Sequence, residues 1–340
     1  MELGVFTRVS ITYTREDPSV VTVEVTEEAP LTARYEVRYD DKDGAAGDVD
    51  AELGNLFGRG LALGGRYRLG PDIEDERVSL QLPALFGGDL VASAFRTSED
   101  TPADPSDPGV GTNNSLERGL QVQQKMRLPR AVDLLFGYRF RRITETSPFF
   151  LEPITVSVAA LEGSLLRDTR DFVLDARRGS FLSVNLEYSP EAIGSELRFV
   201  KSFGQAFFYK PLGPSWLWGH AYRLGLAWPF AGQQLIPDER FMAGGANSVR
   251  GYPTDSLGPR DIFGEPTGGD ATVVINQELR YRHPSGLGAA LFWDAGNVFE
   301  SVSAIGFDLK HSLGLGLRWS SPVGPLRFDP TKEVEFCIPS

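Results

Sequence analysis

The chain has 340 residues, of which 34 are Lys or Arg and 46 are Asp or Glu, so its formal net charge is −12 at pH 7. This acidic balance argues against a nucleic-acid-binding surface, because such surfaces need basic patches. The single cysteine, Cys337, excludes an intramolecular disulfide, and no apolar run approaches the roughly 18 residues of a membrane helix. A membrane barrel stays compatible with this composition, because its strands alternate lipid-facing and lumen-facing residues.

Residues 1–30 differ in pattern from the rest of the chain. They contain two short strand-like segments, "VSITYT" and "VVTVEVTEEAP", joined by the polar turn "REDPS". Two short strands cannot bury a core of their own. We therefore expect this segment to be the C-terminal remnant of a periplasmic domain whose front is missing.

From residue 31 onward the dominant pattern is the alternation of apolar and polar side chains. The stretches "LTARYEVRYD", "AVDLLFGYRFRR" and "HSLGLGLRWSS" each follow it over their whole length. A period of two predicts a strand with one apolar and one polar face. The chain is therefore predicted to be all-β.

The length of these strands indicates what their apolar faces contact. In "SWLWGHAYRLGLAWPF" the apolar face has aromatic residues at both ends, from Trp216 to Trp228, and aliphatic residues between them. Twelve steps of about 3.3 Å, tilted by about 40°, rise roughly 30 Å, which is near the height of a membrane barrel's apolar band. Strands of soluble sandwiches usually stop at about five or six residues. The length therefore favours a membrane.

Counting alternating segments between turn clusters gives sixteen strands, an even number that suits a closed bacterial barrel. Short connections, such as "LPRA" and "LGPS", alternate with long ones, such as "TSEDTPADPSDPGVGTN". The expected strands are 32–40, 48–58, 59–70, 76–87, 90–100, 114–129, 131–145, 154–170, 178–190, 196–212, 215–230, 270–284, 287–300, 307–322, 324–332 and 333–340.

Catalytic and metal-binding patterns are not found in the sequence. His220, His283 and His311 are scattered over three expected strands without paired spacing, and no GxSxG, HExxH or P-loop pattern occurs. "GLGLG" at Gly314 is explained by strand alternation. We expect no enzyme activity, no metal and no cofactor.

Three segments near the C-terminus carry the most specific signal. They are "FMAGGANSVRGYPTDSLGPRD", "INQELRYR" with Glu278, and "AALFWDAGNVFE" with Asp294. Together they resemble the barrel of the BamA and TamA superfamily of outer-membrane assembly proteins, which includes two-partner-secretion transporters and chloroplast import channels. The stretches "LGNLFGRG", "GLGLRWSSPVGPLRFD" and "LRDTRDFVLDARRGSFLSVNLEYSPEAIGSELRF" extend the resemblance over the whole chain, and "EAIGSELRF" leans toward TamA. Residues 1–30 resemble the end of a POTRA domain, the periplasmic module that precedes such barrels.

The resemblance implies that the loop at about 231–269 folds back into the barrel lumen and docks on the inner wall. Its turn is formed by Gly244 and Gly245, and its tip by Val249, Arg250, Gly251 and Tyr252. The docking wall is formed by Phe292, Asp294, Gly296 and Glu278. The chemistry is coherent, because a guanidinium can hold a carboxylate through two parallel hydrogen bonds and glycine permits close backbone approach.

The C-terminus departs from the family pattern of a full amphipathic last strand with a terminal aromatic residue. Val334, Phe336 and Ile338 keep the alternation, but the strand is short and Pro339 cannot donate to a ladder. The seam between strands 32–40 and 333–340 is therefore expected to be weakly paired. Such an edge can template an incoming strand by β-augmentation.

We therefore expect a sixteen-stranded antiparallel transmembrane β-barrel over residues 31–340, in a bacterial outer membrane and preceded by a POTRA remnant over residues 1–30. The resemblance implies a non-enzymatic role in inserting and folding barrel proteins or autotransporters. The expected partners are unfolded outer-membrane or secreted clients, the lipid bilayer and, through missing POTRA domains, a periplasm-spanning or lipoprotein partner, without nucleic acid. Two alternatives remain, a two-partner-secretion pore for an unfolded client and a binding or structural barrel with no transport role.

Overall fold

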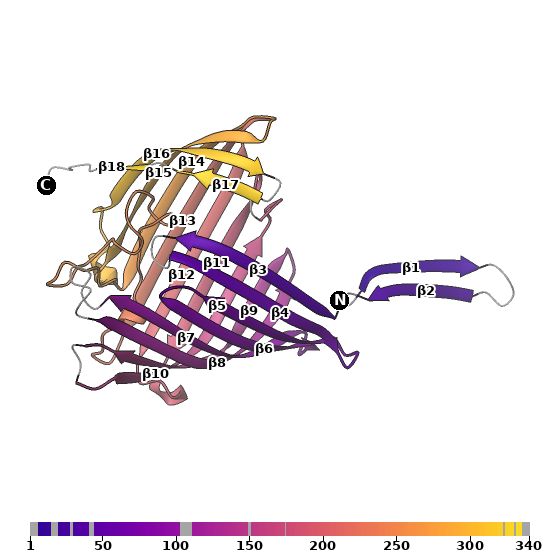
Figure 1. Cartoon of the computed structure of the whole chain (residues 1–340), viewed down its shortest axis with the longest axis horizontal. Coiled ribbons are helices and arrows are strands. Elements are labelled where there is room, and N and C mark those ends of the chain that lie inside the picture. The colour runs from indigo at the N-terminus through magenta and orange to yellow at the C-terminus, as the bar shows by residue number, and fades with distance from the viewer. Residues whose placement is uncertain are drawn as a thin grey trace. The chain divides into compact units, whose positions relative to one another are not determined.

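The fold is all-β (Figure 1). The structure, a computed structural model, describes residues 6–14, 20–27, 30–40, 44–102, 111–148, 151–173, 175–321, 324–329 and 331–334. Besides strands, these ranges contain the single-turn 3-10 helices η2 (Glu191–Ile193), η3 (Pro237–Glu239) and η4 (Val302–Ala304). Within them, helices long and apolar enough to cross a membrane are absent.

The described residues form two sheets. The strands β1 (Phe6–Thr14) and β2 (Val20–Glu27) form a two-stranded sheet, and all other strands belong to one large antiparallel sheet in sequence order. The strands of the large sheet are β3 (Leu31–Asp40), β4 (Gly44–Leu56), β5 (Leu61–Leu69), β6 (Ile73–Leu85), β7 (Gly88–Pro102), β8 (Thr112–Leu128), β9 (Val132–Thr146), β10 (Ile154–Asp168), β11 (Gly179–Ser189), β12 (Phe199–Pro211), β13 (Trp216–Pro229), β14 (Ala271–Arg282), β15 (Leu287–Phe299), β16 (Lys310–Ser321), β17 (Gly324–Phe328) and β18 (Thr331–Val334). The all-β class predicted from the period-two pattern is confirmed.

The chain divides into two compact units, and the first comprises residues 1–126 and 137–158. It contains the β1–β2 hairpin, whose ladder runs from the pair Phe6 and Glu27 to the pair Thr14 and Val20. It also contains the antiparallel strands β3 to β8. The hairpin is a sheet of its own. Its assignment to a POTRA domain stays a prediction.

The second unit comprises residues 127–136 and 159–340 and contains the candidate site. Its strands from β11 onward are antiparallel neighbours, so their connections alternate between two ends of the sheet. At one end the connections 212–215, 283–286 and 322–323 are short. At the other end, residues 230–270 form the long connection between β13 and β14.

The last two segments of the sheet correct the expected strand count. β17 and β18 both pair with β16 in one continuous register, with Phe328 opposite Leu317 and Thr331 opposite Gly314. They are two parts of one interrupted strand, so the sixteen strands of the large sheet that the structure describes occupy fifteen positions. The division expected at residue 332 was wrong because the interruption follows Asp329, where the sequence has a proline that cannot donate to a ladder. Phe336, Ile338 and Pro339 lie outside the described residues.

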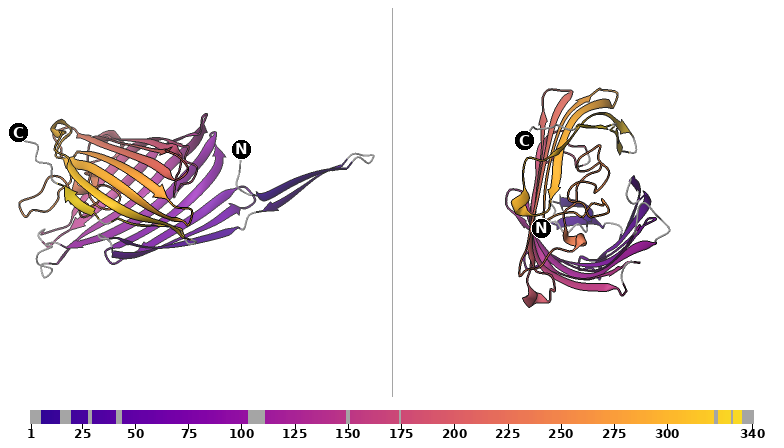
Figure 2. Two further views of the ribbon diagram at one scale, coloured as in Figure 1. Left: turned by 90° about the horizontal axis from the view of Figure 1, so that it is seen from above. Right: turned by 90° about the vertical axis from the view of Figure 1, so that its left-hand side faces the viewer.

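The faces of β13 agree with the alternation. Its exposed large apolar side chains are Trp216, Trp218, Tyr222, Leu224 and Trp228. The opposite face of this unit's sheet is covered by the connection between β13 and β14, which lies in its concavity (Figure 2). That connection is the loop singled out in the sequence.

Candidate functional site

The loop between β13 and β14 is shaped by two adjacent glycines. Gly244 and Gly245 have φ values of 117° and 86°, in the left-handed region that favours glycine. A Cβ at Gly244 would collide with the carbonyl oxygen of Pro253, and the Gly245 amide donates to the Tyr252 carbonyl at 2.9 Å. The two glycines therefore let the chain close on itself and present residues 246–252 to the sheet.

An apolar cluster holds the loop against β14 and β15. Val249 is fully buried and packs with the residues Ala243, Leu257, Val274 and Val298, with Tyr252 against the cluster. The sheet makes room for it at Gly296, where a Cβ would lie 2.8 Å from Val249 Cγ2 and 2.7 Å from the Val273 carbonyl oxygen. A side chain at position 296 would therefore push the loop away.

Arg250 binds Asp294 through two parallel side-chain hydrogen bonds. Its Nε donates to Asp294 Oδ2 at 2.7 Å and its Nη2 donates to Oδ1 at 2.9 Å, while its backbone amide also donates to Oδ2 at 3.1 Å. Arg250 is 7% exposed and Asp294 0%. A lysine could not reproduce this two-pronged geometry.

Further groups complete the surroundings of the guanidinium. Its Nη1 donates to Glu278 Oε2 at 2.7 Å and to Asp329 Oδ2 at 3.2 Å. Its Cζ lies 3.5 Å from the centroid of the Phe292 ring. Burial alone lowers the pKa of Arg250, but the hydrogen bonds and charges of Asp294 and Glu278 outweigh it and raise the pKa above its ordinary value.

The carboxylates are shared with two arginines of the sheet. Arg280 Nε and Arg318 Nη2 donate to Glu278 Oε1 at 2.7 Å and 3.0 Å, and Arg318 also binds Asp329. Arg280, Arg318 and Asp329 were not expected as members of the site. The sequence contained a signal for two of these residues. Alternation places Arg280 on the same face as Glu278, and Asp329 ends the segment "GPLRFD".

Four hydrogen bonds fix the rest of the tip. Asn276 Nδ2 donates to the Ser248 carbonyl at 2.8 Å, and Tyr252 Oη donates to the His311 carbonyl at 3.2 Å. Arg327 Nη2 on β17 donates to the Ala246 carbonyl at 3.1 Å and to Asn247 Oδ1 at 2.9 Å. The loop is therefore bonded to β14, β16 and β17.

The structure brings the expected site residues together. The expected tip residues lie in the loop and the expected wall residues on β14 and β15, with Gly251 at a φ of 98°. In the described ranges no group of three or more His, Cys, Asp or Glu has the arrangement of a metal site. The arrangement consists of one buried cation held by three carboxylates and an aromatic face, which positions a loop.

The comparison with protein families identifies this architecture. The Omp85 superfamily domain matches residues 55–336. The chain belongs to the Omp85 superfamily. It is an outer-membrane β-barrel protein of the bacterial type, and proteins of this superfamily are assembly or transport factors acting on outer-membrane or secreted proteins.

Individual relatives agree with this assignment. The outer membrane protein assembly factor BamA of Nitratidesulfovibrio vulgaris is 35% identical over 168 residues, which is 48% of this chain and 21% of that protein. The chloroplastic outer envelope protein 80 of Arabidopsis thaliana is 24% identical over 300 residues, 81% of this chain and 39% of that protein. The chain thus covers between about a fifth and two fifths of these relatives.

Solved structures share the fold. BamA from Haemophilus ducreyi lacking POTRA domains 1–3 has a TM-score of 0.85 at 17% identity, covering 99% of this chain and 74% of that one. CdiB from Escherichia coli has a TM-score of 0.66 at 16% identity, covering 98% of this chain and 66% of that one. The lean toward TamA stays a prediction.

Proposed function

We propose that this chain is the membrane part of an assembly factor that inserts and folds outer-membrane barrel proteins or autotransporters, without enzymatic chemistry. The 35% identity to a BamA supports this role. Residues 1–30 are taken as the end of a POTRA domain, which the separate β1–β2 sheet supports. Further POTRA domains would recruit a periplasm-spanning or lipoprotein partner.

The observation that carries the mechanism is the interrupted terminal strand. β17 and β18 pair with β16 through five and four residues, whereas β14 and β15 pair through twelve. β17 also ends the strand order of the sheet. A short, broken edge strand exposes backbone donors and acceptors to an incoming strand and is easily displaced. A client strand would add to this edge.

The loop site gives this mechanism a fixed platform. The bonds of Arg327 to Ala246 and Asn247 tie β17 to the loop tip, and those of Asp329 and Arg250 tie the residue after β17 to the same tip. The docked loop would therefore hold the start of the terminal strand in register while its second half is exchanged. Arg250, Asp294 and Glu278 act in this proposal as positioning residues.

Crosslinking tests the proposal. A photoreactive amino acid at Phe328, which is 68% exposed on β17, is compared with one at Leu224, which is exposed on β13 inside the sheet. With a stalled barrel client in proteoliposomes, we expect adducts at position 328 and few at position 224. Equal yields would overturn the edge mechanism. Adducts concentrated at the inner-face position Arg223, with increased ion conductance, would support the two-partner-secretion pore instead.

A further inference from the structure

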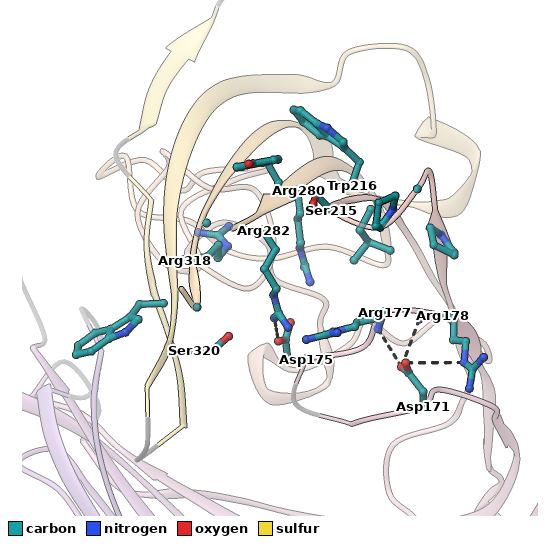
Figure 3. A pocket seen from close by; sticks show the side chains of 18 of the residues that line it. Asp171, Asp175, Arg177, Arg178, Ser215, Trp216, Arg280, Arg282, Arg318 and Ser320 are labelled. Atoms are coloured by element: carbon teal, nitrogen blue, oxygen red, sulfur yellow. Dashed lines mark hydrogen bonds and ion pairs between the residues drawn. The ribbon is translucent and has the colours of Figure 1, made fainter. Parts of the chain in front are cut away.

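A cavity of about 480 Å³ lies in the second unit at the end that carries the short connections (Figure 3). Its walls come from residues 171, 175, 177 and 178 between β10 and β11, from the connections 212–215 and 283–286, and from the adjoining ends of β12 to β17. A volume of this size suits a small ligand or a few side chains of a polypeptide. Its lining shares Arg280, Arg318 and Arg327 with the loop site, but in the described part of the chain Arg177 and Arg282 have no contact with that site.

The lining of this cavity is strongly basic. It contains two carboxylates, Asp171 and Asp175. Its arginines are Arg177, Arg178, Arg280, Arg282, Arg318 and Arg327. The chain as a whole has a net charge of −12, so this concentration of guanidinium groups runs against its composition. Guanidinium groups bind carboxylates and phosphates through paired hydrogen bonds.

The arginines contributed by the strands face away from lipid. Arg280 and Arg282 alternate along β14 with Tyr281, and they share a face with Glu278, which bonds to the docked loop. Arg318 on β16 bonds to the same Glu278. These guanidinium groups therefore lie on the inner side of the sheet, which lipid tails do not contact, while the lining also includes Trp216 and Trp319 of the exposed apolar face.

The arginines differ in how far they are already neutralised. Arg280 and Arg318 bond to Glu278, and Arg327 donates to the neutral oxygens of the loop. Among the described residues, no carboxylate lies within ion-pair distance of the Arg177 guanidinium. This side chain is therefore available to an incoming anion.

The segment 169–178 supplies a carboxylate that already occupies part of the cavity. Asp175 forms an ion pair with Arg282, as Figure 3 shows. Asp175 and Arg282 remain 23% and 32% exposed, so an incoming group can reach the pair. An external carboxylate would compete with Asp175 for the same guanidinium.

We propose that this cavity binds the carboxylates of an acidic stretch of an unfolded polypeptide, with Arg177 and Arg282 as its principal contacts and Asp175 as the internal competitor. That this polypeptide is an assembly client rests on the proposed function. The inner-face position favours a polypeptide over a lipid headgroup. The Arg282–Asp175 pair shows that a carboxylate fits beside this guanidinium.

The test measures binding of a fluorescent acidic peptide to the detergent-solubilised chain by anisotropy, beside the same peptide with Asn and Gln for Asp and Glu. Arg177→Gln combined with Arg282→Gln should weaken binding roughly tenfold, and raised ionic strength should weaken it further. Asp175→Asn should strengthen binding by about threefold. Arg198→Gln removes one positive charge at a position outside the cavity lining and should leave binding unchanged within about twofold, whereas Arg177→Gln or Arg282→Gln alone should weaken it. The difference in electrophoretic mobility between heated and unheated samples should be the same as for the wild type, which verifies that each variant is folded.

Several outcomes overturn the proposal. They are equal binding of the neutral peptide, unchanged binding by the Arg177 and Arg282 variant, and weaker binding by Asp175→Asn. Displacement of the peptide by inorganic phosphate at the same concentration indicates a general anion site, and displacement by an anionic phospholipid in mixed micelles indicates a lipid site. Either result overturns the polypeptide assignment.

A parallel assay of barrel-client insertion into proteoliposomes separates this inference from the proposed function. If the wild type inserts clients but its peptide binding does not depend on the arginines, only the cavity proposal fails. If the arginines bind the peptide but no client is inserted, the proposed function fails and the carboxylate site stands.

Discussion

Removing Arg250 should cost more than removing Asp294, because the two residues have different numbers of remaining partners. Arg250→Ala leaves Asp294, which is 0% exposed, without its ion-pair partner. Leaving one charge of a buried pair uncompensated costs about 3 to 5 kcal/mol. Asp294→Ala leaves Arg250 bonded to Glu278 and Asp329 and stacked on Phe292, so we expect a smaller cost, about 1 to 3 kcal/mol. The double mutant should be no worse than Arg250→Ala alone, since it removes the stranded carboxylate.

Limited chymotrypsin digestion measures these differences within the loop itself. Cleavage after Leu257, which is followed by a glycine, requires the loop to leave the wall, since Leu257 is 5% exposed within the buried cluster and its amide donates to the Ala243 carbonyl. Phe263, which is 81% exposed, provides an internal reference in the same loop. If opening is fast relative to cleavage, 3 to 5 kcal/mol raises the ratio of cleavage after Leu257 to cleavage after Phe263 by roughly a hundredfold to several thousandfold.

Two results would refute the reasoning. Strict additivity of the two alanine substitutions would mean that Arg250 and Asp294 do not interact. A larger effect of Asp294→Ala than of Arg250→Ala would mean that Glu278 and Asp329 do not share the guanidinium. Arg250→Lys should fall between wild type and Arg250→Ala, because an ammonium keeps the charge but loses the paired hydrogen bonds.

Three further outcomes are expected. Gly296→Ala should undock the loop and raise cleavage after Leu257 through the clash described above, whereas Gly163→Ala, where an added Cβ meets nothing within 4 Å, should not. A cysteine at Leu224, on the apolar face of β13, should react with lipid-soluble but not water-soluble maleimides, and one at Arg223 should show the reverse; equal aqueous labelling at both positions would contradict the membrane assignment. The backbone amides of Arg177, Arg178 and Phe172, that of Arg177 foremost, donate to Asp171 and lower the pKa of its carboxyl group. These amides should therefore be protected from hydrogen exchange above about pH 4, and they should lose this protection as the pH falls through the lowered pKa. Asp171→Asn should remove this pH dependence, and an unchanged profile would contradict it.

The regular parts of this structure were predictable because one physical rule governs them. Each strand must present apolar side chains to one side, so alternation identified β13, and the aromatic residues at its ends indicated the membrane. The last strand was not predictable in the same way. The break after Asp329 leaves β17 and β18 in one register, and the pairing of both with β16 depends on backbone positions that alternation does not specify.

The contacts of the candidate site were also predictable only in part. The pairing of Arg250 with Asp294 was expected from resemblance, supported by the fit of guanidinium and carboxylate. The participation of Arg280, Arg318 and Asp329 was not expected. Sequence alternation assigns a residue to one face of the sheet, but it does not show which residue of the neighbouring strand lies opposite it. The register of β14, β15 and β16 sets which residues lie side by side on neighbouring strands. With this register, Glu278 bonds to Arg250, Arg280 and Arg318.

Packing and charge make different contributions to the docked loop. The cluster around Val249 supplies the burial of apolar surface, which is non-directional and would tolerate small displacements of the loop. The ion network is directional, since two oxygens of Asp294 must meet two nitrogens of one guanidinium, but desolvation offsets much of its energy. Apolar contacts thus account for most of the affinity of the loop for the wall, and the buried charges restrict it to one position. A loop bound in this way has one docked position, which the hydrogen-bond geometry fixes. Its release costs only a moderate free energy, because the separated charges regain water when the tip leaves the wall.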